Sequence, residues 1–297
     1  MTVAAGTGLL SCTPTPQQAP RRIRWAMGWL LWRDFKGRDI PLQEALQDLH
    51  ELGLDGIEFT PRSGELEKQG YTRESFIELL NELNLQVSGH YFSAPFYDTA
   101  RKEEIAQALQ ERIDSIKSFG GKNIIIGPPD IPSNGENHLT LIKQMAPVLN
   151  DLGKRALDQG VEIGLHPHLN TIVETPEEIH AAMEATDPSY VFMSPDTGHI
   201  YLGGGDVVEI LRTYQDRLNY FHFKDGAGTF TRPDFFPNMR ELGRGEVDFP
   251  AVMKLLNDIG YTGWINVEQD FTNQTTRKSA EQSMEYINKQ LKPILRS

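Results

Sequence analysis

The chain has 297 residues, enough for one α/β barrel of about 250 residues plus its ends, and 39% hydrophobic residues exclude disorder of the whole chain. Its formal net charge of −12 at pH 7 repels phosphate backbones and anionic lipid headgroups, so no nucleic-acid partner is expected. The single cysteine, Cys12, excludes an internal disulfide and a cysteine-based metal cluster.

The first 21 residues are expected to form an extension before one catalytic domain at residues 22–297. Residues 8–12 read GLLSC and resemble the lipobox of a bacterial lipoprotein, but no lysine or arginine precedes them and the apolar stretch is short for an export signal. Two interpretations stay open: a truncated signal of an exported lipoprotein, or a cytoplasmic extension if Met1 is the true start. No other stretch approaches the roughly 20 apolar residues of a membrane-spanning helix.

From Arg22 onward, short apolar β-like runs alternate with longer segments of helical period. Eight strands are predicted, at residues 23–27, 56–60, 86–91, 123–127, 162–166, 191–196, 219–224 and 264–268. A predicted helix follows each strand, at residues 42–51, 73–84, 102–119, 138–159, 176–185, 207–213, 250–259 and 277–291. Eight such units in succession, without an obvious linker, predict a single closed (β/α)8 TIM barrel.

Local signals agree with these units. Thr175 and Pro176, with Glu178, give an N-cap, a first-turn proline and a capping-box glutamate for one helix. The longest interruption, residues 226–247, is rich in glycine, proline and arginine, and it is expected to form a loop over the barrel mouth.

Four short polar segments follow or end strands five to eight, at residues 166–168, 196–199, 222–225 and 267–270. In barrel enzymes the site lies at the C-terminal ends of the strands, so these side chains are expected to converge. Aspartate, glutamate and histidine bind hard or borderline divalent cations without redox chemistry. The sequence therefore predicts one metal site and indicates an enzyme.

The seventh strand shows why a structural interpretation is the weaker one. Alternation places Tyr220, His222 and Lys224 on one face, and a polar set that faces into the barrel top is hard to explain as packing. Glu268 would be a costly buried carboxylate without a cation or partner. Taken alone, Asp196 is more simply explained as a loop or capping aspartate. Together with the other three polar segments, it is more simply explained as a metal ligand.

Further side chains are expected around the substrate. His166 and His168 flank Pro167, so both rings can face the pocket, one binding metal and one binding substrate. The expected substrate contacts are Glu58 and His90 at the ends of strands two and three, Arg244 as an anion or carbonyl clamp, and Trp29 as a flat apolar wall. A purely structural role is the alternative for each of them.

Five segments resemble one known family: LHPHLNT at 165–171, DTGH at 196–199, HFKD at 222–225, GRGEVDF at 243–249 and GYTGWINVEQD at 260–270. They resemble the inosose dehydratases of inositol catabolism, within the wider xylose-isomerase-like superfamily of sugar phosphate isomerases and epimerases. The resemblance covers most of the chain from about residue 22. It implies one divalent metal, typically manganese, cobalt, magnesium or zinc, held by Asp196, His222, Glu268 and a group from strand five. In the isomerase and epimerase branch that group is usually a glutamate, and His166 stands there in this chain.

The expected function is metal-dependent dehydration of an inosose-like sugar or cyclitol through an enediolate, which is a carbon-oxygen lyase reaction. Glu268 or His168 is the expected base, and Lys224 or His199 the expected acid; the sequence does not choose between them. The alternatives are a sugar isomerase or epimerase, a 3-keto-glycoside eliminase or hydrolase, and a metal-containing sugar-binding protein without catalysis. Assembly into a homo-oligomer is also left open.

Overall fold

The computed structural model of the chain describes residues 22–33 and 40–296. The proposed extension at residues 1–21, with its lipobox-like segment, lies outside these residues, so its separation from the catalytic domain stays a prediction. Within the described residues, no helix has both the length and the apolar character needed to cross a membrane.

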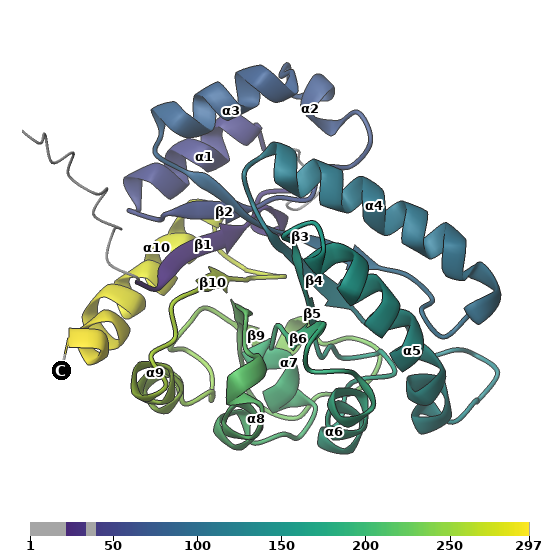
Figure 1. The fold of residues 1–297 in the computed structure, drawn as a ribbon. Helices are drawn as coiled ribbons and strands as arrows, with labels where there is room; N and C mark the ends of the chain where they lie inside the picture. The colour runs from purple at the N-terminus through teal and green to yellow at the C-terminus, as the bar shows by residue number, and fades with distance from the viewer. Residues whose placement is uncertain (1–21, 34–39, 297) are drawn as a thin grey trace, which may run out of the picture.

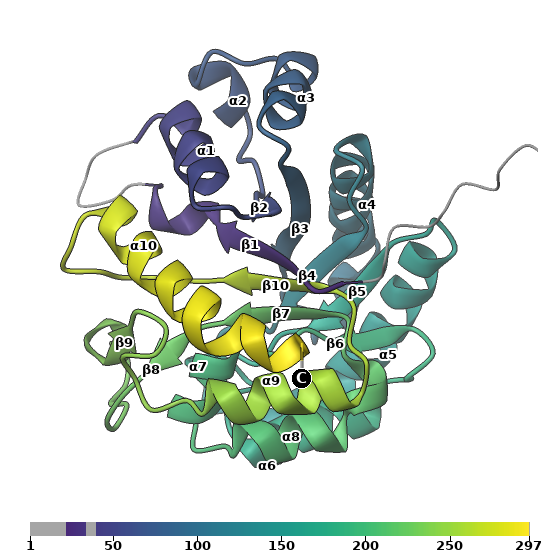
Figure 2. The ribbon, with the colours of Figure 1, turned by 90° about the vertical axis from the view of Figure 1, so that its left-hand side faces the viewer.

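Eight parallel strands form the central sheet, and Figures 1 and 2 show helices arranged around it. The strands are β1 (Arg24–Gly28), β2 (Gly56–Glu58), β3 (Gln86–Ser93), β4 (Asn123–Gly127), β5 (Glu162–Leu165), β6 (Val191–Met193), β7 (Tyr220–Phe223) and β10 (Trp264–Val267). Their order is β6-β5-β4-β3-β2-β1-β10-β7. Two isolated parallel bridges, Met193 to Leu218 and Asp196 to His222, join β6 to β7. The sheet therefore closes, and the predicted TIM barrel is confirmed.

The helices are α1 (Leu42–Glu51), α2 (Glu65–Lys68), α3 (Arg73–Glu82), α4 (Lys102–Ser118), α5 (His138–Leu157), α6 (Pro176–Ala185), α7 (Thr197–Leu202), α8 (Val207–Thr213), α9 (Phe249–Asp258) and α10 (Thr276–Tyr286). A π-helical turn, η5 (Ile287–Leu291), continues α10. All eight predicted helices are present, and η5 accounts for the predicted end at residue 291. The short helices α2 and α7 were not predicted.

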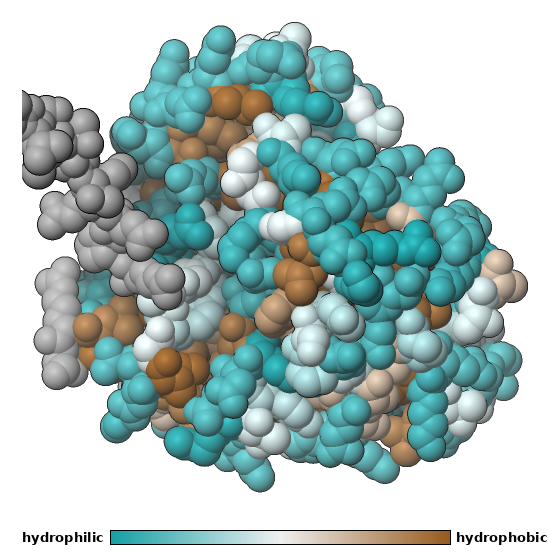
Figure 3. Space-filling model, in the orientation of Figure 1, coloured by the Kyte–Doolittle hydropathy of each residue, from teal (hydrophilic) through white to brown (hydrophobic). Residues whose placement is uncertain are grey.

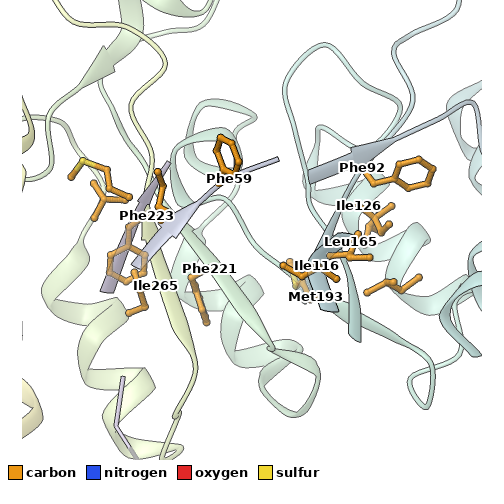
Figure 4. Packing of buried hydrophobic residues seen from close by; sticks show 14 of the residues in the cluster. Phe59, Phe92, Ile116, Ile126, Leu165, Met193, Phe221, Phe223 and Ile265 are labelled. Atoms are coloured by element: carbon orange, nitrogen blue, oxygen red, sulfur yellow. The ribbon is translucent and has the colours of Figure 1, made fainter. Parts of the chain in front are cut away.

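Two apolar layers fill the fold. The larger one lies between the sheet and the helices, where Figure 4 shows Phe221, Phe223 and Ile265 on the neighbouring strands β7 and β10. A smaller cluster that includes Tyr220 and Trp264 occupies the barrel interior. Tyr220 and the two phenylalanines thus lie on opposite faces of β7, as the alternation predicts. The view in Figure 3 shows a largely hydrophilic exterior with scattered apolar patches.

The segment at residues 226–247, the mouth loop, covers part of the barrel's C-terminal end, as predicted. Its first strand, β8 (Asp225–Gly226), pairs with β9 (Met239–Arg240) after a single 3-10 turn, η4 (Phe236–Asn238). The ring of Phe235 lies 5.7 Å from that of His168 and 5.2 Å from that of His199. The loop is also tied to the β5 side, because Asn170 Nδ2 donates to the carbonyl oxygen of Pro233 at 2.8 Å.

Candidate metal centre

The four predicted metal ligands converge at the C-terminal ends of the last four barrel strands. His166 directly follows β5, Asp196 is the N-cap of α7 after β6, His222 lies in β7, and Glu268 directly follows β10. Asp196 Oδ2 lies 4.0 Å from His166 Nε2 and 3.9 Å from His222 Nδ1. Glu268 Oε2 lies 2.5 Å from His222 Nδ1. Four segments distant in sequence thus present nitrogen and oxygen atoms to one point.

Neighbouring groups fix which atom of three of these side chains faces that point. His166 Nδ1 donates to the carbonyl oxygen of Ser194 at 3.2 Å, which leaves Nε2 as the free acceptor. His222 Nε2 donates to Glu58 Oε2 at 2.6 Å, which directs Nδ1 inward. Asp196 Oδ1 accepts the His199 backbone N–H at 2.9 Å, which leaves Oδ2. Metal-binding histidines commonly hold their second nitrogen in this way.

The donor set fits a divalent cation. Asp196 Oδ2, His222 Nδ1 and Glu268 Oε2 are buried and make no aligned hydrogen bond, although the Lys224 ammonium lies 3.2 Å from Asp196 Oδ2 and 3.8 Å from Glu268 Oε2. Such orphaned buried atoms are costly, and a cation between them would satisfy all three. Imidazole nitrogens and carboxylate oxygens are also ligand types that a divalent metal such as zinc takes in proteins. A second triad, His166, His168 and His199, is similarly compact, with ligand atoms within 4.8 Å of one another.

Burial and charge set the protonation of the candidate ligands. Burial raises the pKa of Asp196 to about 6, although the Lys224 ammonium opposes this, so the carboxylate is largely ionised at neutral pH. Burial lowers the pKa of His166 well below its ordinary value, and neutral imidazole is the form that binds metals. Burial also acts to lower the pKa of His222, but the carboxylates of Glu268 and Glu58 outweigh it and hold that pKa well above the ordinary value. Cation binding at Nδ1 would therefore release a proton.

Beside these ligands lie the three other predicted catalytic groups. Lys224 Nζ lies 2.7 Å from Asp270 Oδ2 and 2.8 Å from His199 Nε2. Burial acts to lower the pKa of Lys224, but the Asp196 and Asp270 carboxylates reverse the effect, so the ammonium stays charged. His168 Nδ1 donates to the carbonyl oxygen of Leu169 at 2.7 Å, and burial followed by the Lys224 charge lowers its pKa. The site thus holds a charged proton donor next to a neutral imidazole.

A cavity of about 270 Å³ opens beside the candidate metal centre. Its lining residues are Gly28, Trp29, Leu30, Arg33, Glu58, Thr60, Tyr91, His166, His168, Glu268 and Asp270. Trp29 stands in the wall, as predicted, and Glu58 lines the cavity while its carboxylate is engaged with His222. The volume suits a small molecule.

Two predicted substrate contacts are wrong. His90 packs its ring against α4, where Nε2 lies 3.0 Å from Ser115 Oγ. The pairing of β2 with β3 jumps by one residue at Ser88, a bulge that reverses the later alternation and turns His90 outward. Arg244 is exposed beside Glu285, away from the cavity. The glycines flanking Arg244 instead bring their backbone N–H groups to the Asp225 carboxylate, at 2.9 and 2.8 Å.

Sequence reasoning assigned no role to several lining residues, among them Tyr91, Arg33 and Asp270. Tyr91 points into the cavity because of the same bulge, which the sequence does not reveal. Arg33 lies in a turn after β1, and no sequence motif around it indicated a role in the site. Asp270 had a usable signal, because it stands two residues after Glu268 and regular alternation places both on one face.

Comparisons with known proteins agree with this architecture. The family model described as "Xylose isomerase-like TIM barrel" matches residues 46–290. An inosose dehydratase of Bacillus velezensis is 29% identical over 277 residues, covering 84% of this chain and 89% of the relative. An inosose dehydratase of Lacticaseibacillus casei is 29% identical over 256 residues, covering 79% and 84%. These relatives are enzymes.

Among solved structures, the IolI protein with a bound zinc atom has a TM-score of 0.74 at 18% identity, covering 92% of this chain and 98% of that one. The probable 3-DHS dehydratase AsbF of Bacillus anthracis has a TM-score of 0.75 at 15% identity, covering 89% and 98%. At these identities the likeness shows the fold alone. The family model, in contrast, spans most of the sequence, and the chain therefore belongs to the xylose isomerase-like TIM barrel family.

Proposed function

We propose that this chain is a divalent-metal-dependent carbon-oxygen lyase that dehydrates an inosose or a similar cyclic keto-polyol. The observation that supports it best is the convergence of one potential ligand atom each from His166, Asp196, His222 and Glu268 at the edge of the cavity. The names of the curated relatives point to the same reaction.

The proposed reaction removes a proton from the carbon next to the substrate carbonyl and then expels a neighbouring hydroxyl group. A bound divalent cation would supply Lewis-acid polarisation of the carbonyl oxygen. His168 is the proposed base, since its Nδ1 is committed to a backbone carbonyl and its Nε2 is left to accept a proton. The carbon-hydrogen electron pair becomes the new double bond of an enediolate. Glu268 is then left to its role as a ligand.

The departing hydroxyl group needs a proton, and Lys224 is the proposed donor. Its ammonium is held charged by Asp196 and Asp270, so it is a fixed source of positive charge in a buried site. As the carbon-oxygen bond breaks, the hydroxyl leaves as water with the lysine proton. His199 Nε2 accepts a hydrogen bond from Lys224 Nζ and so helps to hold the ammonium in position.

An isomerase or epimerase remains the main alternative. It would share the proton abstraction and return the proton to another carbon or face instead of expelling water. In the isomerase and epimerase branch, the fourth ligand from strand five is usually a glutamate; His166 stands there, which favours dehydration. Solvent deuterium incorporation without loss of water would support the alternative.

The test is ultraviolet absorbance of the metal-loaded protein with an inosose. Dehydration creates a conjugated ketone, so absorbance is expected to rise, and chelation of the metal or the Asp196→Ala substitution is expected to abolish the rise. Asp206→Ala is the matched control, because Asp206 caps α8 as Asp196 caps α7 but does not belong to the cluster of candidate metal ligands. Absence of a signal from the loaded wild type would refute the proposal.

A further inference from the structure

We propose that Tyr91 is a specificity-determining residue, whose hydroxyl group forms a hydrogen bond with one hydroxyl group of a polyol substrate. The contact selects a substrate that carries a hydroxyl group at that ring position over one that lacks it. The inference rests on the proposed function, because it concerns the substrate of the same site.

The backbone and the ring of Tyr91 are held by contacts that do not use its hydroxyl oxygen. The backbone N–H donates to Thr60 Oγ1 at 2.6 Å. The ring packs against the small apolar cluster of the barrel interior. It also meets the His166 ring at nearly a right angle, with centroids 5.6 Å apart and planes at 87°. Tyr91 is partly buried and lines the cavity beside the candidate metal centre. The fold thus fixes where the phenol stands.

The hydroxyl end of Tyr91 lies over Gly127, the last residue of β4. A Cβ on Gly127 would lie 2.0 Å from the Tyr91 hydroxyl oxygen, so glycine at this position makes room for the phenol. In the part of the chain that the structure describes, no side chain or backbone group forms a hydrogen bond with this hydroxyl. Its donor and acceptor capacity is therefore left for a molecule in the cavity.

Two other tyrosines of the barrel show the contrast. The Tyr220 hydroxyl lies 2.8 Å from Ser88 Oγ, within hydrogen-bond distance. The Tyr261 hydroxyl donates to the carbonyl oxygen of Trp264 at 3.0 Å. Buried tyrosine hydroxyl groups usually find a partner in this way, because an unpaired polar group is costly to bury. A phenylalanine would make the same ring contacts as Tyr91, so packing alone does not account for the hydroxyl group.

The chemistry of the phenol matches that of a polyol. A tyrosine hydroxyl both donates and accepts hydrogen bonds, as does each hydroxyl group of a cyclitol ring. A substrate that fills the cavity displaces water from it, and the Tyr91 hydroxyl then bonds to the substrate or stays unpaired. An analogue without the matching hydroxyl group leaves the phenol unpaired and binds more weakly. The discrimination therefore follows from one oxygen atom.

The experiment measures equilibrium binding of myo-inositol and its monodeoxy analogues to the metal-loaded full chain by calorimetry. These probes have no carbonyl group, so binding is read without dehydration. We expect one analogue to bind wild type about tenfold more weakly than myo-inositol, and Tyr91→Phe to lower the affinity for myo-inositol by a similar factor. The variant is expected to bind that analogue and myo-inositol within about twofold of each other, since the hydroxyl group that distinguishes them has lost its partner. The other analogues should lose affinity equally in both proteins.

Tyr261→Phe is the matched control, because it removes a hydroxyl group from a tyrosine that does not line the cavity. It is expected to leave every affinity unchanged, and thermal unfolding checks that both variants are folded. The inference is overturned if Tyr91→Phe binds myo-inositol as wild type does, if no ring position distinguishes the two proteins, or if wild type binds none of the probes.

The two proposals fail separately. A rise in ultraviolet absorbance with an inosose, without the expected effect of Tyr91→Phe on binding, would refute this inference alone. The expected effect on binding, without a rise in absorbance, would refute dehydration and leave the contact between Tyr91 and a polyol in place.

Discussion

Glu58 and His222 show how one contact sets the chemistry of the candidate metal centre. The 2.6 Å hydrogen bond from His222 Nε2 to Glu58 Oε2 leaves Nδ1 facing Asp196 and Glu268. Partners of this kind are commonly worth 10- to 100-fold in metal affinity. We expect Glu58→Ala to weaken divalent-metal binding by at least about tenfold, measured by competition with a chromogenic chelator. Equal affinities for wild type and variant would show that the contact does not orient the ligand.

His90 gives a pH-dependent prediction, because burial lowers its pKa from 6.5 to about 4 in the folded protein. A depressed histidine pKa contributes stability that is fully present above about pH 6.5 and is lost as the pH falls toward 4. At pH 5 the loss is about 2 kcal/mol. We expect His90→Gln to be relatively more stable than wild type at pH 5 than at pH 7.5, by about that amount, in urea denaturation. A difference independent of pH would contradict the assigned burial effect.

The sequence predicted residues well where regular alternation holds and poorly where it breaks. The groups after β5, β6, β7 and β10 converge because parallel strands deliver their ends to one place. His90 was misplaced because a single extra residue, Ser88, reverses the faces of β3. Arg244 was wrongly placed at the substrate, because the glycines on either side of it bind the buried carboxylate of Asp225 and not a ligand.

Among the elements, the mouth loop is held at its base by Asp225. This carboxylate accepts backbone N–H groups from Gly226, Gly243, Gly245 and Val247. A Cβ on Gly245 would lie 2.2 Å from Asp225 Oδ1, so close approach requires glycine there. One side chain thus holds the base of the loop that brings Phe235 over the histidine rings.

We expect Asp225→Ala to lower the free energy of unfolding by about 3 kcal/mol, because several buried N–H groups lose their acceptor. Cleavage within the mouth loop by a dilute protease should also become faster. Asp234→Ala is the control, since Asp234 is an exposed residue of the same loop that accepts from the Phe236 backbone N–H. Equal stability of the Asp225 and Asp234 variants would exclude the anchoring role.

The long helices were predictable because each has several turns of apolar periodicity and many have capping residues, as Thr175 has at the start of α6. The short helices α2 and α7 span four and six residues, too few for periodicity to show. Both matter for the site, since Glu65 of α2 accepts a hydrogen bond from Trp29 Nε1 in the cavity wall and α7 is capped by Asp196. Elements that tertiary contacts impose locally are the ones that sequence patterns miss.

Over the whole molecule, the barrel is least firmly joined between β6 and β7. Those strands share two isolated bridges, whereas β3 and β4 share four paired residues in regular ladder. We expect backbone amides along β6 and β7 to exchange with deuterium faster than those of β3 and β4 in the metal-free protein, measured by mass spectrometry. Adding a divalent metal should slow exchange at this seam more than elsewhere. Uniform protection across the strands would contradict the prediction.

The architecture as a whole was predictable because eight strand-helix units repeat with few interruptions. The sequence could not show which two neighbouring strands of the barrel are held together least firmly, since that depends on how many ladder hydrogen bonds each pair forms. Only Met193–Leu218 and Asp196–His222 are bridged between β6 and β7, and no local sequence pattern reveals this.

The sparse pairing between β6 and β7 has a consequence for how long the folded protein persists. Asp196 and His222 stand on opposite sides of it, and their backbones form one of its two bridges. A cation bound by both side chains would stabilise the barrel between β6 and β7, the pair of strands that separates most easily. Loss of the cation would then end catalysis and loosen the fold in a single event, so molecules that cannot turn over substrate would also be those most readily cleared by proteases.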